Sequence, residues 1–249
     1  MTTARLDGRI AAVTGAELPF ARGLALALGK AGAAVALLGD ASALAATVTE
    51  LEAGDARAVA IDAEWGTREA AEDALAIVAD ALGPPDVLVH AAQPALAFEQ
   101  CDLADTDDER FEAVWEGSMR STLFLLQAAF PYLHDRAGRV LLVTPTPSMS
   151  GAARLVPYTM VIEAQRVLAK AAARQWGPDG ITVNCLAPAP EHVPIGMESA
   201  EVSLAPPALG GPGDPEHDVG PIAAFLASEA ARFVTGVTIS ADGGIWMAP

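Results

Sequence analysis

Tyr158 is the residue whose neighbours bear most directly on chemistry. It lies in Val156-Pro157-Tyr158-Thr159-Met160-Val161-Ile162, at the start of an alanine-rich run with helical character. A lysine four residues after a tyrosine lies one helical turn away on the same face. Its ammonium group there favours the ionised phenol, whose pKa is about 10 in water. The fourth residue here is Ile162, so the sequence supplies a phenol without the cation that would make it useful for proton transfer at neutral pH.

Length and charge limit the class of protein that positions this tyrosine. The chain has 249 residues, 52% of them hydrophobic, and a formal net charge of −17. This length suits one α/β domain over residues 1–249. The charge argues against binding to nucleic acid or to an anionic membrane surface. The N-terminus lacks the apolar segment of a signal peptide, and no apolar run approaches the ~20 residues of a membrane span.

Cysteine and histidine usage bears on metal binding and on the cellular compartment. Cys101 and Cys185 are isolated, and the histidines are scattered along the chain. Because no CxxC pair or His/Cys cluster has the spacing of metal ligands, we expect no metal site. Two isolated thiols fit the reducing cytoplasm, which is the predicted location.

Short apolar runs alternate with helical segments along the whole chain. The predicted strands are residues 10–13, 35–38, 58–61, 87–89, 139–144, 182–186 and 237–240. The predicted helices are residues 20–30, 41–51, 68–82, 107–133 with a break near Gly117, 158–176 and 221–227. Apolar strands that alternate with helices predict a parallel sheet covered on both faces. We therefore expect an α/β fold with a single Rossmann-type doubly wound sheet of about seven strands.

Several short motifs stand at the ends of these predicted elements. They are Val13-Thr14-Gly15, Asp86-Val87-Leu88-Val89, Gly138-Arg139-Val140, Gly180-Ile181-Thr182-Val183-Asn184, Ala187-Pro188, Phe225-Leu226-Ala227-Ser228, Val234-Thr235-Gly236 and Asp242-Gly243-Gly244. In this order and at this spacing the chain resembles the short-chain dehydrogenase/reductase family over nearly its whole length. The resemblance implies the family's fold and an oxidoreductase ancestry, whereas fold alone does not imply activity.

The loop after the first strand departs from the family's phosphate-binding pattern, Thr-Gly-x-x-x-Gly-x-Gly. The chain reads Thr14-Gly15-Ala16-Glu17-Leu18-Pro19-Phe20-Ala21, so only Gly15 remains. Such glycines let a pyrophosphate approach the backbone at a helix N-terminus. Pro19 lacks an N–H group, Ala21 adds a methyl group, and Glu17 brings a carboxylate toward the phosphates. We expect dinucleotide binding to be weakened, and the sequence favours a protein without a cofactor.

Other positions match the family's cofactor contacts. Asp40, Asp62 and Ala92 follow or end the second, third and fourth strands, and with Gly15 they are the cofactor-binding candidates if a dinucleotide still binds. A carboxylate at Asp40 would accept from a ribose 2′-OH and repel a 2′-phosphate, which favours NAD over NADP. Capping of the next helix is the alternative role for Asp40. His90 replaces an asparagine, and we expect it to hydrogen-bond to backbone rather than to transfer protons.

The family's catalytic asparagine and serine align with Ser118 and Pro145. Pro145 cannot donate a hydrogen bond to a substrate carbonyl. Its neighbours Thr144 and Thr146 carry hydroxyl groups, although side chains alternate in direction along an extended chain. The catalytic candidates are therefore Tyr158, Ser118 and Thr144.

No other spacing restores the missing cation. Enoyl reductases of the family place lysine seven residues after the tyrosine, and that position is Gln165. An arginine in place of the lysine, as in the dehalogenase branch, is excluded by Ile162. Lys170 lies three helical turns beyond Tyr158. The threonine that usually contacts the nicotinamide side of the cofactor aligns with Val193.

Three functions stay open from the sequence. The first is a member that has lost NAD(P)-dependent hydride transfer and binds or transforms a small, mostly apolar molecule without redox chemistry. Tyr158 would then be a hydrogen-bond donor or weak general acid, under a loop over residues 187–215 that carries Met197, Leu204 and Leu209. The second is an atypical NAD(P)-dependent oxidoreductase. The third is a noncatalytic subunit that associates through helices 107–133 and 158–176, and the resemblance implies a homodimer or homotetramer.

Overall fold

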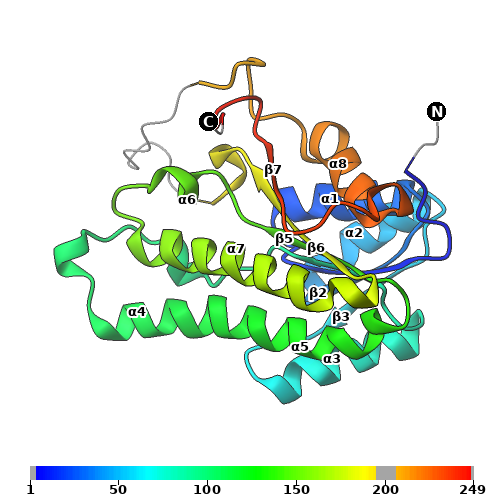
Figure 1. The fold of residues 1–249 in the computed structure, drawn as a ribbon. Helices are drawn as coiled ribbons and strands as arrows, with labels where there is room; N and C mark the ends of the chain where they lie inside the picture. The colour runs from blue at the N-terminus through cyan, green and yellow to red at the C-terminus, as the bar shows by residue number, and fades with distance from the viewer. Residues whose placement is uncertain (1–3, 195–205, 248–249) are drawn as a thin grey trace.

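The strands of the protein form one parallel sheet in the computed structural model, which describes residues 4–194 and 206–247 (Figure 1). The sheet has seven strands in the order β3-β2-β1-β4-β5-β6-β7. Their bounds are β1 Ile10–Thr14, β2 Ala34–Gly39, β3 Ala58–Asp62, β4 Val87–His90, β5 Arg139–Val143, β6 Thr182–Pro188 and β7 Thr238–Ala241. The predicted Rossmann-type doubly wound sheet is confirmed.

Helices cover both faces of this sheet, as Figure 1 shows. Their bounds are α1 Pro19–Lys30, α2 Ala41–Ala53, α3 Arg68–Ala81, α4 Asp108–Trp115, α5 Ser121–His134, α6 Pro147–Ser150, α7 Val156–Trp176 and α8 Gly220–Ala227. Helices α1, α2 and α8 pack into the core on one face, and α3, α5 and α7 pack into the core on the other.

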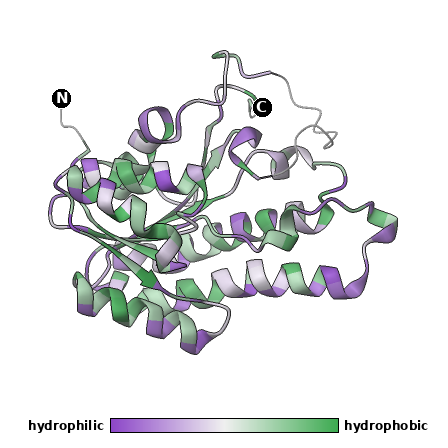
Figure 2. Ribbon diagram, turned by 180° about the vertical axis from the view of Figure 1, so that it is seen from behind, coloured by the Kyte–Doolittle hydropathy of each residue, from purple (hydrophilic) through white to green (hydrophobic). Residues whose placement is uncertain are grey.

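The apolar strands are explained by these two cores. Val35 and Leu37 of β2 enter the first core, while Ala36 and Leu38 enter the second. Successive side chains of a strand point to opposite faces, so a strand covered on both faces is apolar at most of its positions. Figure 2 shows the same division, with hydrophobic residues along the strands and both hydrophobic and hydrophilic residues on the helices.

Two local features differ from the sequence-based expectation. The predicted break near Gly117 is a π-helical turn, η3 Glu116–Arg120, that joins α4 to α5. Pro94 packs over this turn so closely that a Cβ on Gly117 would lie 3.0 Å from its ring. Helix α7 begins at Val156, two residues before Tyr158.

The predicted loop over residues 187–215 lies only partly within the described residues. Strand β6 continues to Pro188, which shortens the loop at its start. Met197 and Leu204, two of the expected lid residues, lie outside the described residues. Leu209 is 87% exposed. No helix among the described residues is long and apolar enough to cross a membrane.

The turn after β1 demands glycine. Gly15 has a φ of 78°, and a Cβ there would lie 2.8 Å from the backbone nitrogen of Ala92. We expect Gly15→Ala to lower the free energy of unfolding by about 2 kcal/mol or more, because overpacking and a left-handed backbone add. Urea unfolding measures this loss. Gly66→Ala is the control, since a Cβ on Gly66 meets nothing within 4 Å; equal losses in both variants would contradict the argument.

Candidate functional site

The candidate site lies at the carboxyl edge of the sheet, where the strand order reverses. Strand β1 lies between β2 and β4, and crevices at such reversals are the usual ligand sites of these folds. An inner cavity of about 30 Å³ lies here, similar to the ~30 Å³ share of one water molecule in the liquid. Its walls are Leu18, Phe20, Ala21, Ala91, Gln93, Phe98, Val143, Pro145, Tyr158, Pro188, His192, Val193 and Pro194.

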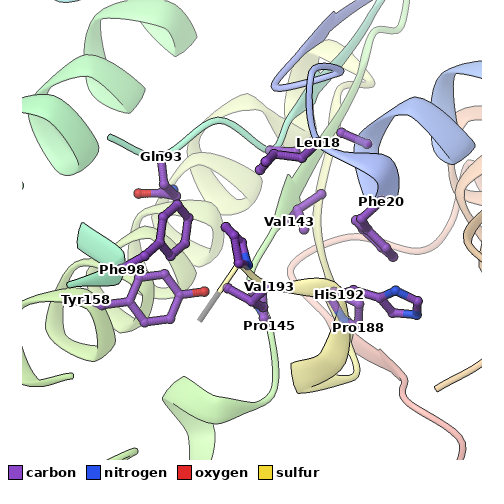
Figure 3. A pocket seen from close by; sticks show the side chains of 13 residues that line it. Leu18, Phe20, Gln93, Phe98, Val143, Pro145, Tyr158, Pro188, His192 and Val193 are labelled. Carbon is purple, nitrogen blue, oxygen red and sulfur yellow. The ribbon is translucent and has the colours of Figure 1, made fainter. Parts of the chain in front are cut away.

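Side chains from distant parts of the chain meet in the inner cavity (Figure 3). The Tyr158 hydroxyl points toward Val193, and Pro145 lies below them in this view. The imidazole of His192 points the other way, against the Phe20 ring at 5.1 Å between centroids. Its Nε2 atom lies 3.0 Å from the carbonyl oxygen of Pro212. His192 therefore ties the loop after β6 to α1 rather than facing the phenol.

Tyr158 is deeply buried and is held in its neutral form. Its side chain is 1% exposed, and burial raises its pKa above the usual value, although the nearby Arg166 charge opposes the shift. Ile162, one turn further along α7, is also buried. Both belong to one apolar cluster with Leu155 and Val161. The phenol can donate a hydrogen bond at neutral pH, and its surroundings disfavour the tyrosinate.

Phe98 separates Tyr158 from a larger space. The two rings lie 5.5 Å apart between centroids. Beyond Phe98 is an outer cleft of about 510 Å³, lined by Gly15, Glu17, Leu18, Ala92, Gln93, Ala95, Phe98, Glu99 and Pro194. Four of these residues also line the inner cavity, namely Leu18, Gln93, Phe98 and Pro194. These four residues are the partition between the two spaces.

Arg166 is a buried cation that the sequence analysis did not identify. It is 5% exposed, and its guanidinium donates to Thr144 Oγ1 at 3.0 Å and to the Thr144 carbonyl at 3.2 Å. It also donates to Ser148 Oγ at 3.0 Å and to Thr238 Oγ1 at 3.2 Å. The Glu163 carboxylate balances its charge at 3.1 Å. Arg166 thus joins α7 to β5, α6 and β7.

The other two catalytic candidates do not line the inner cavity. Thr144 is fully buried, and its hydroxyl accepts the hydrogen bond from Arg166. Ser118 lies in the π-helical turn with 0% exposure, and its Oγ atom has no partner among the described residues. Pro145, at the family's serine position, does line the cavity. The structure therefore brings Tyr158 and Pro145 together, and places Ser118 and Thr144 behind the walls.

His90 forms the centre of a buried polar chain. The Thr122 hydroxyl donates to the Ser118 carbonyl at 2.6 Å and accepts from Gln165 Nε2 at 2.8 Å. It can then only accept from His90 Nε2, 2.9 Å away. The Thr14 hydroxyl is left as the donor to His90 Nδ1 at 2.8 Å. The expectation of a backbone partner for His90 is wrong, because two threonine hydroxyls take both ring nitrogens.

The α1 N-terminus is poorly suited to hold phosphate. Pro19 is its first residue and supplies no N–H group. Ala21 is buried and lines the inner cavity with Leu18. Arg22, the cation nearest the loop in sequence, forms an ion pair with Glu50.

The remaining cofactor candidates lie at the same edge of the sheet. Asp40 caps α2 through the backbone N–H groups of Ser42 and Ala43, at 2.9 and 3.4 Å. The Ser42 hydroxyl also donates to this carboxylate and lowers its pKa. Asp62 is exposed at the end of β3. The Ala92 N–H group donates to the Thr14 hydroxyl at 3.4 Å.

Known proteins share this architecture and much of this sequence. A family model described as enoyl-(acyl carrier protein) reductase matches residues 15–246. A short-chain dehydrogenase/reductase of Armillaria gallica is 30% identical, with 98% of each chain covered. The chain belongs to the short-chain dehydrogenase/reductase family. Versicolorin reductase 1 of Aspergillus parasiticus, another member, is 30% identical over 96% of this chain and 97% of its own.

Solved structures of the family superpose closely on this chain. A dehydrogenase/reductase from Sinorhizobium meliloti 1021 has a TM-score of 0.88 and 31% identity, with 99% and 98% of the chains covered. A blue fluorescent protein from a metagenomic library, in complex with NADPH, has a TM-score of 0.85 and 29% identity, with 98% and 100% covered. An Agrobacterium tumefaciens protein with bound NADP has a TM-score of 0.84 and 26% identity, with 98% of each chain covered.

The burial of Tyr158 can be tested by chemical modification. Nitration by tetranitromethane requires an accessible phenolate, so we expect Tyr158 to resist it while the less buried Tyr132, the other tyrosine, reacts. Phe98→Ala opens the partition to the outer cleft and should raise the nitration rate of Tyr158 several-fold, as peptide mass spectrometry would measure. Phe111→Ala, which removes a ring stacked on Trp115 outside both spaces, is the control. Equal rates in the two variants would show that Phe98 is not the barrier.

His90 makes stability depend on pH. Burial lowers its pKa from 6.5 to about 4, so between these values the unfolded chain binds a proton that the folded chain does not. Stability should therefore fall as the pH falls from about 6.5 to about 4, by up to ~3 kcal/mol. Urea unfolding at pH 5.0 and 7.5 measures the dependence in wild type and in His90→Asn. The variant should lose this part of the slope, and an unchanged slope would assign it to other groups.

Proposed function

We propose that this member of the short-chain dehydrogenase/reductase family has lost NAD(P)-dependent hydride transfer, and that it binds or transforms a small, mostly apolar molecule without redox chemistry. The observation that carries the proposal is the setting of Tyr158. The phenol is buried, its pKa is raised, and the residue one turn away is Ile162. A tyrosine in this state suits hydrogen-bond donation to a carbonyl or hydroxyl oxygen, or weak general-acid chemistry.

The proposed ligand lies mainly in the outer cleft. The volume of about 510 Å³ is within the range of ordinary ligand pockets, ~300–1,000 Å³. Movement of Phe98 would let the ligand reach the Tyr158 hydroxyl. Thr144 and Ser118 would support the walls of the site rather than contact the ligand. The Thr144 hydroxyl is bound by Arg166, and the Ser118 carbonyl is bound by Gln165.

An atypical NAD(P)-dependent oxidoreductase is the second candidate. It is favoured by the NADPH and NADP found in the two related structures. In that case the dinucleotide would be held by the four cofactor candidates, Gly15, Asp40, Asp62 and Ala92. The carboxylates of Asp40 and Asp62 would favour NAD over NADP, because a 2′-phosphate adds negative charge.

A noncatalytic, oligomerising subunit is the third candidate, and one surface supports it. A groove of about 520 Å³ between α5 and α7 includes the apolar side chains of Leu123, Phe130, Leu168 and Trp176. Such a surface suits a homodimer or homotetramer. The unpaired cysteines fit the reducing cytoplasm as the proposed location.

Nucleotide titration separates the first two candidates. We expect NAD, NADH, NADP and NADPH each to bind the wild-type protein with a Kd above about 1 mM in calorimetry, because Arg22 is paired with Glu50 and Pro19 supplies no N–H group at the start of α1. Tight binding of any one of them would refute the loss of the cofactor. A screen of neutral carbonyl fragments by ligand-observed NMR, compared between wild type and Tyr158→Phe, then tests the role of the hydroxyl.

A further inference from the structure

Glu17 makes an unusual contact across the carboxyl edge of the sheet. It lies in the loop between β1 and α1, and its side chain reaches the end of the neighbouring strand β2. There its Oε1 atom accepts a hydrogen bond from the backbone N–H group of Asp40 at 3.1 Å. The loop that would normally cradle a phosphate thus places a carboxylate at the end of β2, beside the crevice in which related folds hold a dinucleotide.

The carboxylate of Glu17 lies directly against the backbone of Gly39. A Cβ added to Gly39 would overlap Glu17 Oε1, and Gly39 has a φ of 151°. Gly39 is the last residue of β2 and pairs with Asp62 of β3. The absence of a side chain at Gly39 leaves the space that the Glu17 carboxylate fills.

Asp40 already has hydrogen-bond partners at the start of α2. Its carboxylate is engaged by the N-terminus of α2 and by the Ser42 hydroxyl. In dinucleotide-binding folds a carboxylate after the second strand receives the ribose hydroxyls, and the crevice beside it is open. Here the Asp40 carboxylate has another role, and the Glu17 carboxylate covers the Asp40 N–H group that faces the crevice.

The negative charges at this edge of the sheet also disfavour an anionic dinucleotide. Glu17, Asp40 and Asp62 all lie at this edge, and Glu17 and Asp40 are joined by the hydrogen bond already described. Arg22, which could offset them, is paired with Glu50. An anionic dinucleotide would have to displace one carboxylate and lie beside two others.

We propose that Glu17 is a specificity-determining residue that excludes dinucleotides, because its carboxylate acts as an internal ligand of the backbone at the end of β2. This inference rests on the proposed function, since it names the residue responsible for the lost cofactor. The Glu17 carboxylate takes the place of an external ligand at the β2 end. The outer cleft, which Glu17 also lines, is left to neutral molecules.

The test is a gain of binding. Glu17→Ser removes the carboxylate and clears the crevice, and Glu17→Gln removes the charge but keeps the size of the side chain. Glu64→Gln is the matched control, because Glu64 is exposed on the loop after β3 and its change alters the net charge equally. NADH fluorescence and calorimetry with ADP-ribose measure binding, and thermal melting verifies that each variant is folded.

We expect Glu17→Ser to bind NADH and ADP-ribose at least about tenfold more tightly than wild type, the factor that a charged hydrogen bond of ~1.5 kcal/mol corresponds to. Glu17→Gln should gain less, and Glu64→Gln should match wild type. If folded Glu17→Ser binds no better than Glu64→Gln, the inference is overturned while the loss of the cofactor stands. Submillimolar binding by wild type would instead refute the loss of the cofactor itself, and the exclusion with it.

Discussion

The close approach of the turn after β1 to the end of β4 is the constraint on which the carboxyl edge depends. The backbone of Gly15 passes within contact of Ala91 and Ala92, and the Thr14 hydroxyl accepts from both of their N–H groups. This contact fixes the point where the sheet order reverses, with or without a ligand. It explains why Thr14 and Gly15 keep the family pattern when the next positions have changed. The first pair serves the turn itself, whereas the glycine that lets a pyrophosphate approach the backbone is needed only when a dinucleotide binds.

Much of the fold follows from the sequence because strands and helix ends are indicated by patterns among neighbouring residues. Strands covered on both faces are mostly apolar, and glycine follows the last residue of α2 and of α7. The π-helical turn at Glu116–Arg120 and the short helix at Pro147–Ser150 were harder to predict. The first has Pro94 packed on Gly117, and the second is held through Ser148 by Arg166. Contacts between such distant residues leave little trace in a local pattern.

The candidate site also contains residues that a local pattern predicts and residues that depend on distant contacts. Tyr158 and Ile162 could be placed on one helix face by counting residues, and both are buried there. Arg166 was missed because a basic residue on a helix is usually solvated, and its partners Thr144, Ser148 and Thr238 belong to separate elements. One local signal was present: Arg166 lies four residues after Ile162, on the inward face of α7. The charge on that face stabilises the junction of the elements around Tyr158, and it offsets only part of the effect of burial on the pKa of the phenol.

The buried hydrogen-bond chain through His90 affects which substitutions the protein can tolerate during evolution. Thr14, His90 and Thr122 satisfy one another's hydrogen bonds in a space that excludes water. An apolar or shorter residue at any one position leaves a partner unpaired, which costs ~1–3 kcal/mol. We therefore expect a change at one of these positions to be tolerated best when another of them changes with it, although more than a hundred residues separate the first from the last.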